Sequence, residues 1–72
     1  SRYEYGVLSL LLERPGQVYS RQQIMEHVWE IPDMSLERTV DTHIKTLRYK
    51  LRQISEEEVL ITHRGVGYSI KE

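Results

Sequence analysis

The residues best suited to chemistry lie between positions 38 and 52. This segment holds five basic side chains and one acidic side chain, Asp41, so its net charge is +4, although the whole chain carries −1. Guanidinium and ammonium groups bind phosphates, and arginine and threonine side chains bond to base edges in the DNA major groove. The pattern therefore favours a nucleic-acid surface. The basic residues are Arg38, Lys45, Arg48, Lys50 and Arg52.

A second candidate is the RGVGY stretch at positions 64–68, where two glycines surround a tip between apolar runs. Glycine permits the positive φ angles that a tight hairpin turn requires. Such a turn would project Arg64 into solvent, and narrow A·T-rich minor grooves attract arginine. We interpret Arg64 as a candidate minor-groove contact.

Patterns for catalysis and for metal or cofactor binding are weak. The three histidines have neither the i, i+4 spacing nor the H-E-x-x-H motif of a zinc site. Gly65-x-Gly67 lacks the third glycine and the following helix of a dinucleotide-binding loop, and the acidic run at 56–58 is typical of a solvated helix end. We expect no catalytic residues, no metal and no cofactor.

Length and composition indicate one small domain covering residues 1–72. The chain has no cysteine, which excludes disulfides and thiolate metal sites and agrees with a reducing compartment. No apolar run approaches the roughly 20 residues of a membrane span, and no secretory signal is visible. We expect a cytoplasmic location without membrane contact. Because residue 1 is serine, we also expect the chain to be a piece of a longer protein.

Two helices are predicted in the first half of the chain. Ser1 and Glu4 form a capping-box pattern for a helix that ends before Pro15-Gly16, with apolar positions at Tyr5, Leu8, Leu11 and Leu12. Ser20 and Gln23 form a second capping box. That helix would end near Glu30, because proline disfavours helical geometry at the preceding residue. Its apolar stripe is Ile24, Met25, Val28 and Trp29.

A third, longer helix has the clearest period in the sequence, with Ser35 as its expected N-cap. Its apolar positions are four and three residues apart, which places them on one face; they are Val40, Ile44, Leu47, Leu51 and Ile54. The opposite face carries Arg38, Thr42, Lys45, Tyr49 and Arg52. The alternating apolar residues of VLITHR and YSIK around the glycine turn then predict a hairpin.

Three stretches resemble one family closely. VYSRQQIMEHVW, ERTVDTHIKTLRYKL and ITHRGVGYSI are similar to the DNA-binding effector domain of OmpR/PhoB-type response regulators, and the resemblance runs along essentially the whole chain. RTVDTHIKTLR and RGVGY are specific together, because both motifs and their separation fit. Within this family RQQ, VWE and RTVDTHIKTLR look most like the CreB regulators.

The resemblance implies a winged helix-turn-helix, a mainly α fold of three helices with a C-terminal β-hairpin wing. Residues 20–30 would be the positioning helix, 31–36 a loop facing RNA polymerase, 37–54 the recognition helix and 60–71 the wing. The family also has a small antiparallel sheet ahead of the first helix and a receiver domain, and this chain contains neither. We therefore expect the wing strands to lack a pairing partner.

The resemblance also implies DNA-contacting residues. On the recognition helix these are Arg38, Thr39, Thr42, Lys45, Thr46 and Arg48, and the basic face adds Arg52; Arg21 and Trp29 fall at phosphate-contacting positions of the positioning helix, and Arg64 and Tyr68 at wing contacts. Asp41 would orient neighbouring arginines and exclude wrong bases. Each assignment has a structural alternative. Trp29 suits the core, Tyr68 an anchor for the wing strand and Arg21 an ordinary exposed first turn, while we interpret His43 as a packing residue.

The function implied is sequence-specific binding of double-stranded DNA. A sensor histidine kinase would act through the absent receiver domain, and the phosphorylated protein would dimerise and bind tandem half-sites. The alternative is a winged-helix module that contacts only proteins, because one fold can carry several unrelated functions. The basic face of the third helix and Arg64 favour DNA.

Overall fold

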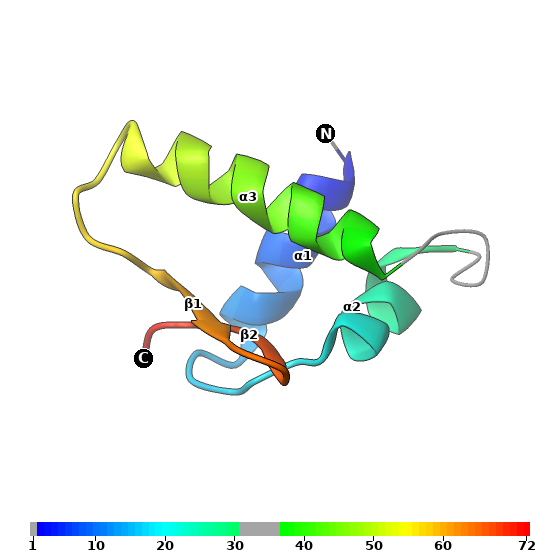
Figure 1. The fold of residues 1–72 in the computed structure, drawn as a ribbon. Coiled ribbons are helices and arrows are strands. Elements are labelled where there is room, and N and C mark those ends of the chain that lie inside the picture. Colours follow the sequence, from blue (N-terminus) through cyan, green and yellow to red (C-terminus); the bar gives the residue numbers. More distant parts are fainter. Residues whose placement is uncertain (1, 31–36) are drawn as a thin grey trace.

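The computed structural model describes residues 2–30 and 37–72 (Figure 1). Three helices are followed by one antiparallel hairpin, so the mainly α, winged helix-turn-helix fold is confirmed. The elements are α1 (Arg2–Glu13), α2 (Arg21–Val28), α3 (Arg38–Arg52), β1 (Leu60–His63) and β2 (Gly67–Ile70).

The core lies where α1 meets the other elements. α3 lies across α1, and α1 also contacts α2 and β2 (Figure 1). One apolar cluster takes residues from every element, which makes the recognition helix and the wing parts of the same rigid unit. Its members are Val7, Leu10, Leu11, Tyr19, Ile24, Met25, Trp29, Val40, Ile44, Leu47, Leu60 and Ile70.

The predicted start of α2 is confirmed. The backbone N–H of Gln23 donates to Ser20 Oγ at 3.1 Å, and the backbone N–H of Ser20 donates to Gln23 Oε1 at 2.9 Å. This reciprocal capping satisfies two backbone donors that the first turn would otherwise leave unpaired. The box fixes where α2 begins, and with it the position of Arg21. The other two expected caps, Ser1 and Ser35, lie outside the described residues.

The apolar face of α3 is confirmed in its first three turns and wrong at its end. Val40, Ile44 and Leu47 are buried, whereas Ile54 is 81% exposed because the helix ends at Arg52. Two of the apolar positions predicted for α1 are also wrong. Tyr5 is 75% and Leu12 52% exposed, and Val7 and Leu10 are buried instead.

The wing is a four-residue hairpin whose register runs from Leu60 opposite Ile70 to His63 opposite Gly67. Its tip closes through a hydrogen bond from the Val66 N–H to the His63 carbonyl at 2.8 Å. Gly65 has φ +74°, the positive angle that a type II turn needs at its third residue. The turn therefore leaves residues 64–66 projecting from the sheet.

The expectation that the wing strands lack a partner is wrong. Tyr19, in the segment before α2, forms an antiparallel bridge with Tyr68 through hydrogen bonds of 2.8 and 2.9 Å. The chains approach so closely that a Cβ on Gly67 would stand 2.0 Å from the Tyr19 carbonyl oxygen. The segment before α2 therefore acts as a short third strand, and only glycine fits at position 67.

Candidate nucleic-acid interface

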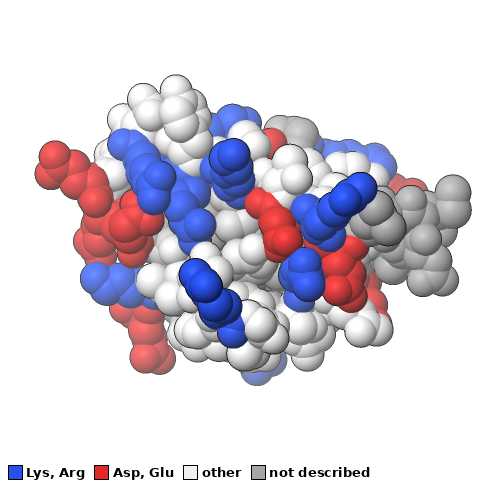
Figure 2. Space-filling view, in the orientation of Figure 1, with Lys and Arg blue, Asp and Glu red and all other residues white. Residues whose placement is uncertain are grey.

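The side of α3 that faces away from the core carries Arg38, Thr42, Lys45, Tyr49 and Arg52, and all five are exposed. We call this the outer face. Figure 2 shows basic side chains over α3 and the wing, with acidic side chains grouped at one edge and a smaller acidic group between the basic ones. The predicted amphipathic division of the helix is therefore confirmed, apart from Ile54.

The basic residues of α2, α3 and the wing differ in whether their side chains already form hydrogen bonds or ion pairs within the protein. Within residues 2–30 and 37–72, the structure gives no hydrogen bond or ion pair to the side chains of Arg38, Lys45 and Arg64. Arg21, Arg48 and Arg52 are all held by acidic or carbonyl groups. The unpaired cations have their full charge available for an external anion.

The three threonines of the predicted site behave differently from the cations. Thr42 Oγ1 donates to the Arg38 carbonyl at 3.4 Å and Thr46 Oγ1 to the Thr42 carbonyl at 3.2 Å, while Thr39 is half-buried. A hydroxyl that donates to its own helix keeps lone pairs that can accept. Thr42 and Thr46 are therefore suited to accept hydrogen bonds from the amino groups of bases.

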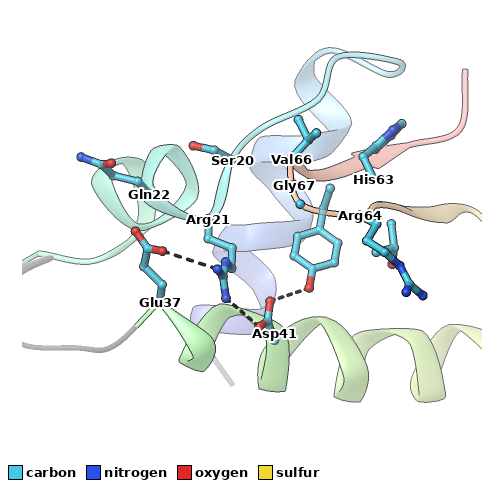
Figure 3. Close-up of a pocket in the computed structure, with 12 residues that line it drawn as sticks. Ser20, Arg21, Gln22, Glu37, Asp41, His63, Arg64, Val66 and Gly67 are labelled. Atoms are coloured by element: carbon cyan, nitrogen blue, oxygen red, sulfur yellow. Dashed lines mark hydrogen bonds and ion pairs between the residues drawn. The ribbon is translucent and has the colours of Figure 1, made fainter.

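A hollow of about 440 Å³ separates the wing tip from the first turns of α2 and α3 (Figure 3). Arg64 lies on its wing side, and Arg21, Glu37 and Asp41 lie on its helical side. The hollow divides the two parts of the candidate interface, the outer face of α3 and the wing tip. Both parts are open to solvent.

Asp41 connects three elements at the base of this hollow. Its Oδ2 accepts a hydrogen bond from Arg21 Nη1 at 3.0 Å, and its Oδ1 accepts one from the Tyr68 hydroxyl (Figure 3). Glu37 Oε1 lies 3.7 Å from Arg21 Nη2. Burial, followed by the hydrogen bond to Asp41, raises the pKa of Tyr68 to about 12. The predicted orienting role of Asp41 toward Arg21 agrees with this contact, and Tyr68 anchors the wing strand.

Arg48 does not lie free on the outer face. Its Nη2 donates to the Leu60 carbonyl at 3.0 Å and to Thr62 Oγ1 at 2.9 Å, so it joins α3 to β1. The side chain is 24% exposed. Arg52 is exposed, but its guanidinium group donates to both carboxylate oxygens of Glu58, at 2.6 and 3.2 Å. Neither arginine reaches an external anion without sharing or exchanging these partners.

Trp29 lies in the core, with 7% of its surface exposed. Its ring stacks on Tyr3 with centroids 4.6 Å apart, and His43 packs 5.7 Å from it. This burial supports a core role for Trp29 rather than a phosphate contact, because the ring offers little surface to a phosphate. His43 is a packing residue, as expected.

Sequence reasoning missed the acidic partners of the basic residues. Glu4 binds Lys50 at 2.6 Å, and this hydrogen bond lowers the pKa of the carboxyl. Glu58 binds Arg52 in the same way. The only signal in the sequence was the acidic run at 56–58 close to a basic helix, and it does not say which carboxylate meets which cation. Across the described parts of the chain, no three His, Asp or Glu residues form a metal cluster, and no helix is long and apolar enough to cross a membrane.

Comparisons with known proteins place this architecture. Residues 1–70 match the family described as transcriptional regulatory protein, C terminal. The chain is 54% identical over 72 residues to the transcriptional regulatory protein CreB of Escherichia coli, covering 99% of this chain and 31% of CreB. It is 40% identical over 68 residues to the heme response regulator HssR of Staphylococcus aureus, covering 94% of this chain and 30% of HssR. The chain thus spans about a third of the length of these relatives.

Solved structures of related domains agree with this family match. The DNA-binding domain of the response regulator AdeR, in complex with an intercistronic region, superposes with a TM-score of 0.90 at 38% identity, covering 100% of this chain and 75% of that chain. The Thermotoga maritima response regulator DrrB, an OmpR/PhoB homologue, gives 0.83 at 32% identity, covering 100% and 33%. The chain therefore belongs to the family of transcriptional regulatory protein C-terminal domains, the DNA-binding domains of OmpR/PhoB-type response regulators.

Proposed function

We propose that this domain binds double-stranded DNA sequence-specifically, with α3 in the major groove and Arg64 in the minor groove. One observation carries the proposal. The unpaired cations on this side of the described structure, Arg38, Lys45 and Arg64, lie on the outer face of α3 and at the wing tip. Cations without a protein partner are the groups that DNA phosphates and groove edges can engage without a competing contact.

The size and seating of α3 support this arrangement. Its 15 residues make a rod of roughly 22 Å, and a major groove about 12 Å wide admits one helix. Val40, Ile44 and Leu47 hold the opposite face against the core, so insertion needs no rearrangement of the helix. Thr42 and Lys45 then face base edges and phosphates.

Arg21 contributes from a second element. It is the first residue of α2, and its side chain remains 44% exposed while bound to Asp41. The positive end of the α2 dipole and this guanidinium lie together, which suits a backbone phosphate. Asp41 accepts from Arg21 on one side and places a negative charge near the groove, which disfavours bases that present acceptors.

In the whole protein, two such domains would bind tandem half-sites after phosphorylation of a receiver domain by a sensor histidine kinase, within the cytoplasm. The lengths of CreB and HssR, of which this chain matches about a third, leave room for a receiver. Residues 31–36 would contact RNA polymerase, and they lie outside the described residues. The AdeR domain, which was crystallised with an intercistronic region, supports DNA as the partner.

Selection of bound duplexes from a random DNA library, followed by titration at several salt concentrations, tests the proposal. Contacts from Arg21, Arg38, Lys45 and Arg64 predict a slope of log K against log salt of about −3 to −4. Ala substitution of Arg38, Lys45 or Arg64 should each reduce the magnitude by about 0.9. Arg14→Ala removes the same charge from an exposed residue after α1 and should leave the slope unchanged. No enrichment of any sequence, with a flat salt dependence, would favour the protein-interaction module.

A further inference from the structure

Two arginines converge on one carboxylate at the C-terminal end of α3. Arg52 donates to both oxygens of Glu58, from Nε at 2.6 Å and from Nη2 at 3.2 Å. Arg48 Nε lies 3.8 Å from Glu58 Oε2. Two guanidinium groups around one planar anion form the arrangement in which arginine binds carboxylates and phosphates alike.

The two arginines are held to different degrees. Arg48 is fixed by the Leu60 carbonyl and the Thr62 hydroxyl of β1, so its position does not depend on Glu58. Arg52 and Glu58 have side chains that are 58% and 49% exposed. The hydrogen bond from Arg52 lowers the pKa of Glu58, which is therefore ionised at neutral pH. Because water screens an exposed ion pair, this one is easily exchanged for another anion.

The pair also lies on the candidate DNA-binding surface. Arg38, Lys45 and Arg52 are seven residues apart along α3, so they form one row with steps of about 10 Å. The first two are unpaired within the described parts of the chain, and the third is covered by Glu58. Glu58 comes from the segment between α3 and β1, and it occupies the place where the row would meet an anion.

We propose that Arg48 and Arg52 form a binding site for a DNA backbone phosphate, and that Glu58 fills this site in the free protein until the phosphate displaces it. The inference rests on the proposed DNA binding and adds to it a residue that lowers affinity. Each binding event must separate Arg52 from Glu58. The carboxylate thereby reduces the net gain from the third cation of the row, without touching the residues that read bases.

Glu58→Gln tests the site, and Glu57→Gln is its matched control. Glu57 is the preceding residue, carries the same charge and is paired with Lys71 at 2.9 Å rather than with either arginine. Affinity for a selected duplex should rise about two- to fivefold in Glu58→Gln beyond any rise in Glu57→Gln. Thermal unfolding of each variant confirms that the domain remains folded.

Arg52→Ala separates a local exchange from a general reduction in negative charge. The gain from Glu58→Gln should disappear when it is made in an Arg52→Ala background. Equal gains in Glu58→Gln and Glu57→Gln, a gain that persists without Arg52, or weaker binding by Glu58→Gln would each overturn the site while leaving DNA binding intact. Failure of the wild-type domain to bind any duplex would instead overturn the proposed function, and this site with it.

Discussion

The Tyr68 hydroxyl donates a hydrogen bond to Asp41 Oδ1 and so joins the wing to the recognition helix (Figure 3). The other oxygen of the same carboxylate accepts from Arg21, the first residue of α2. One acidic side chain thus links α2, α3 and β2 beside the hollow that Arg64 borders. The angle between the wing tip and the outer face of α3 depends on this shared acceptor.

Tyr68→Phe should weaken DNA binding without unfolding the domain. The substitution keeps the ring but removes one hydrogen bond, which contributes about 1 kcal/mol to the free energy of unfolding. Loss of the wing anchor should reduce the contribution of Arg64, so the effects of Tyr68→Phe and Arg64→Ala on affinity should be less than additive. A double-mutant cycle on duplex binding measures this coupling. Strictly additive losses would show that the bond does not position the wing.

The raised pKa of Tyr68 predicts a loss of stability at high pH. A tyrosine with a pKa of about 12 in the folded state and about 10 when unfolded holds its proton more tightly when folded. Its contribution to the free energy of unfolding is complete below pH 10 and is lost as the pH rises from 10 to 12. Denaturant unfolding between pH 8 and 12 should therefore show a steeper decline for the wild type than for Tyr68→Phe. Parallel curves would contradict the assignment.

The two glycines of the wing should respond differently to alanine. Gly65 has φ +74° with open space around it, so Gly65→Ala should cost about 1 kcal/mol from the backbone conformation alone. At position 67 the added Cβ would stand 2.0 Å from the Tyr19 carbonyl oxygen. Gly67→Ala must break the Tyr19–Tyr68 bridge and should destabilise the domain more. Equal melting temperatures for the two variants would show that this bridge contributes nothing to stability.

Leu47 and Lys45 separate stability from recognition on one helix. Leu47 is buried, and Leu47→Ala should lower the free energy of unfolding by roughly 2–5 kcal/mol. Lys45 is exposed on the outer face without a partner in the described structure, so Lys45→Ala should leave the melting temperature nearly unchanged and weaken DNA binding. Calorimetry and duplex titration of both variants measure the two effects. An unfolded Lys45→Ala beside an intact Leu47→Ala would mean that the outer face is assigned to the wrong side.

The sequence was sufficient for features that depend on local spacing. The period of Val40, Ile44 and Leu47 identified the buried face, and the Ser20 and Gln23 capping box identified the start of α2. The sequence did not predict where α3 ends. Nothing in the local pattern shows that α3 stops at Arg52, so Ile54 was placed on a face that the helix no longer has.

Contacts between distant residues were not predictable from spacing either. Arg48 falls beside the basic face, yet it binds β1, twelve residues away at Leu60. Tyr19 supplies the third backbone of the wing from the segment between α1 and α2. Each of these contacts depends on how the elements pack, and one sequence does not determine which acid or carbonyl each arginine meets.

The contribution of Arg64 to affinity should depend on the shape of the DNA minor groove. It is exposed at the wing tip with no partner among residues 2–30 and 37–72, so Arg64→Ala should leave folding almost unaffected. Affinity for the selected site should fall by about 1–3 kcal/mol. The loss should be largest with A·T-rich flanks, because a narrow groove concentrates negative potential there.

Arg64→Lys distinguishes a groove contact from a phosphate contact. Lysine keeps the charge, but its ammonium group is more strongly hydrated and harder to desolvate than a guanidinium group. It should therefore restore only part of the affinity on A·T-rich flanks. Titration of both variants against duplexes that differ only in the flank, A·T-rich or G·C-rich, decides between the two contacts. An equal loss of affinity on both flanks, fully recovered by lysine, would show that Arg64 contacts a phosphate and that this wing does not contact the minor groove.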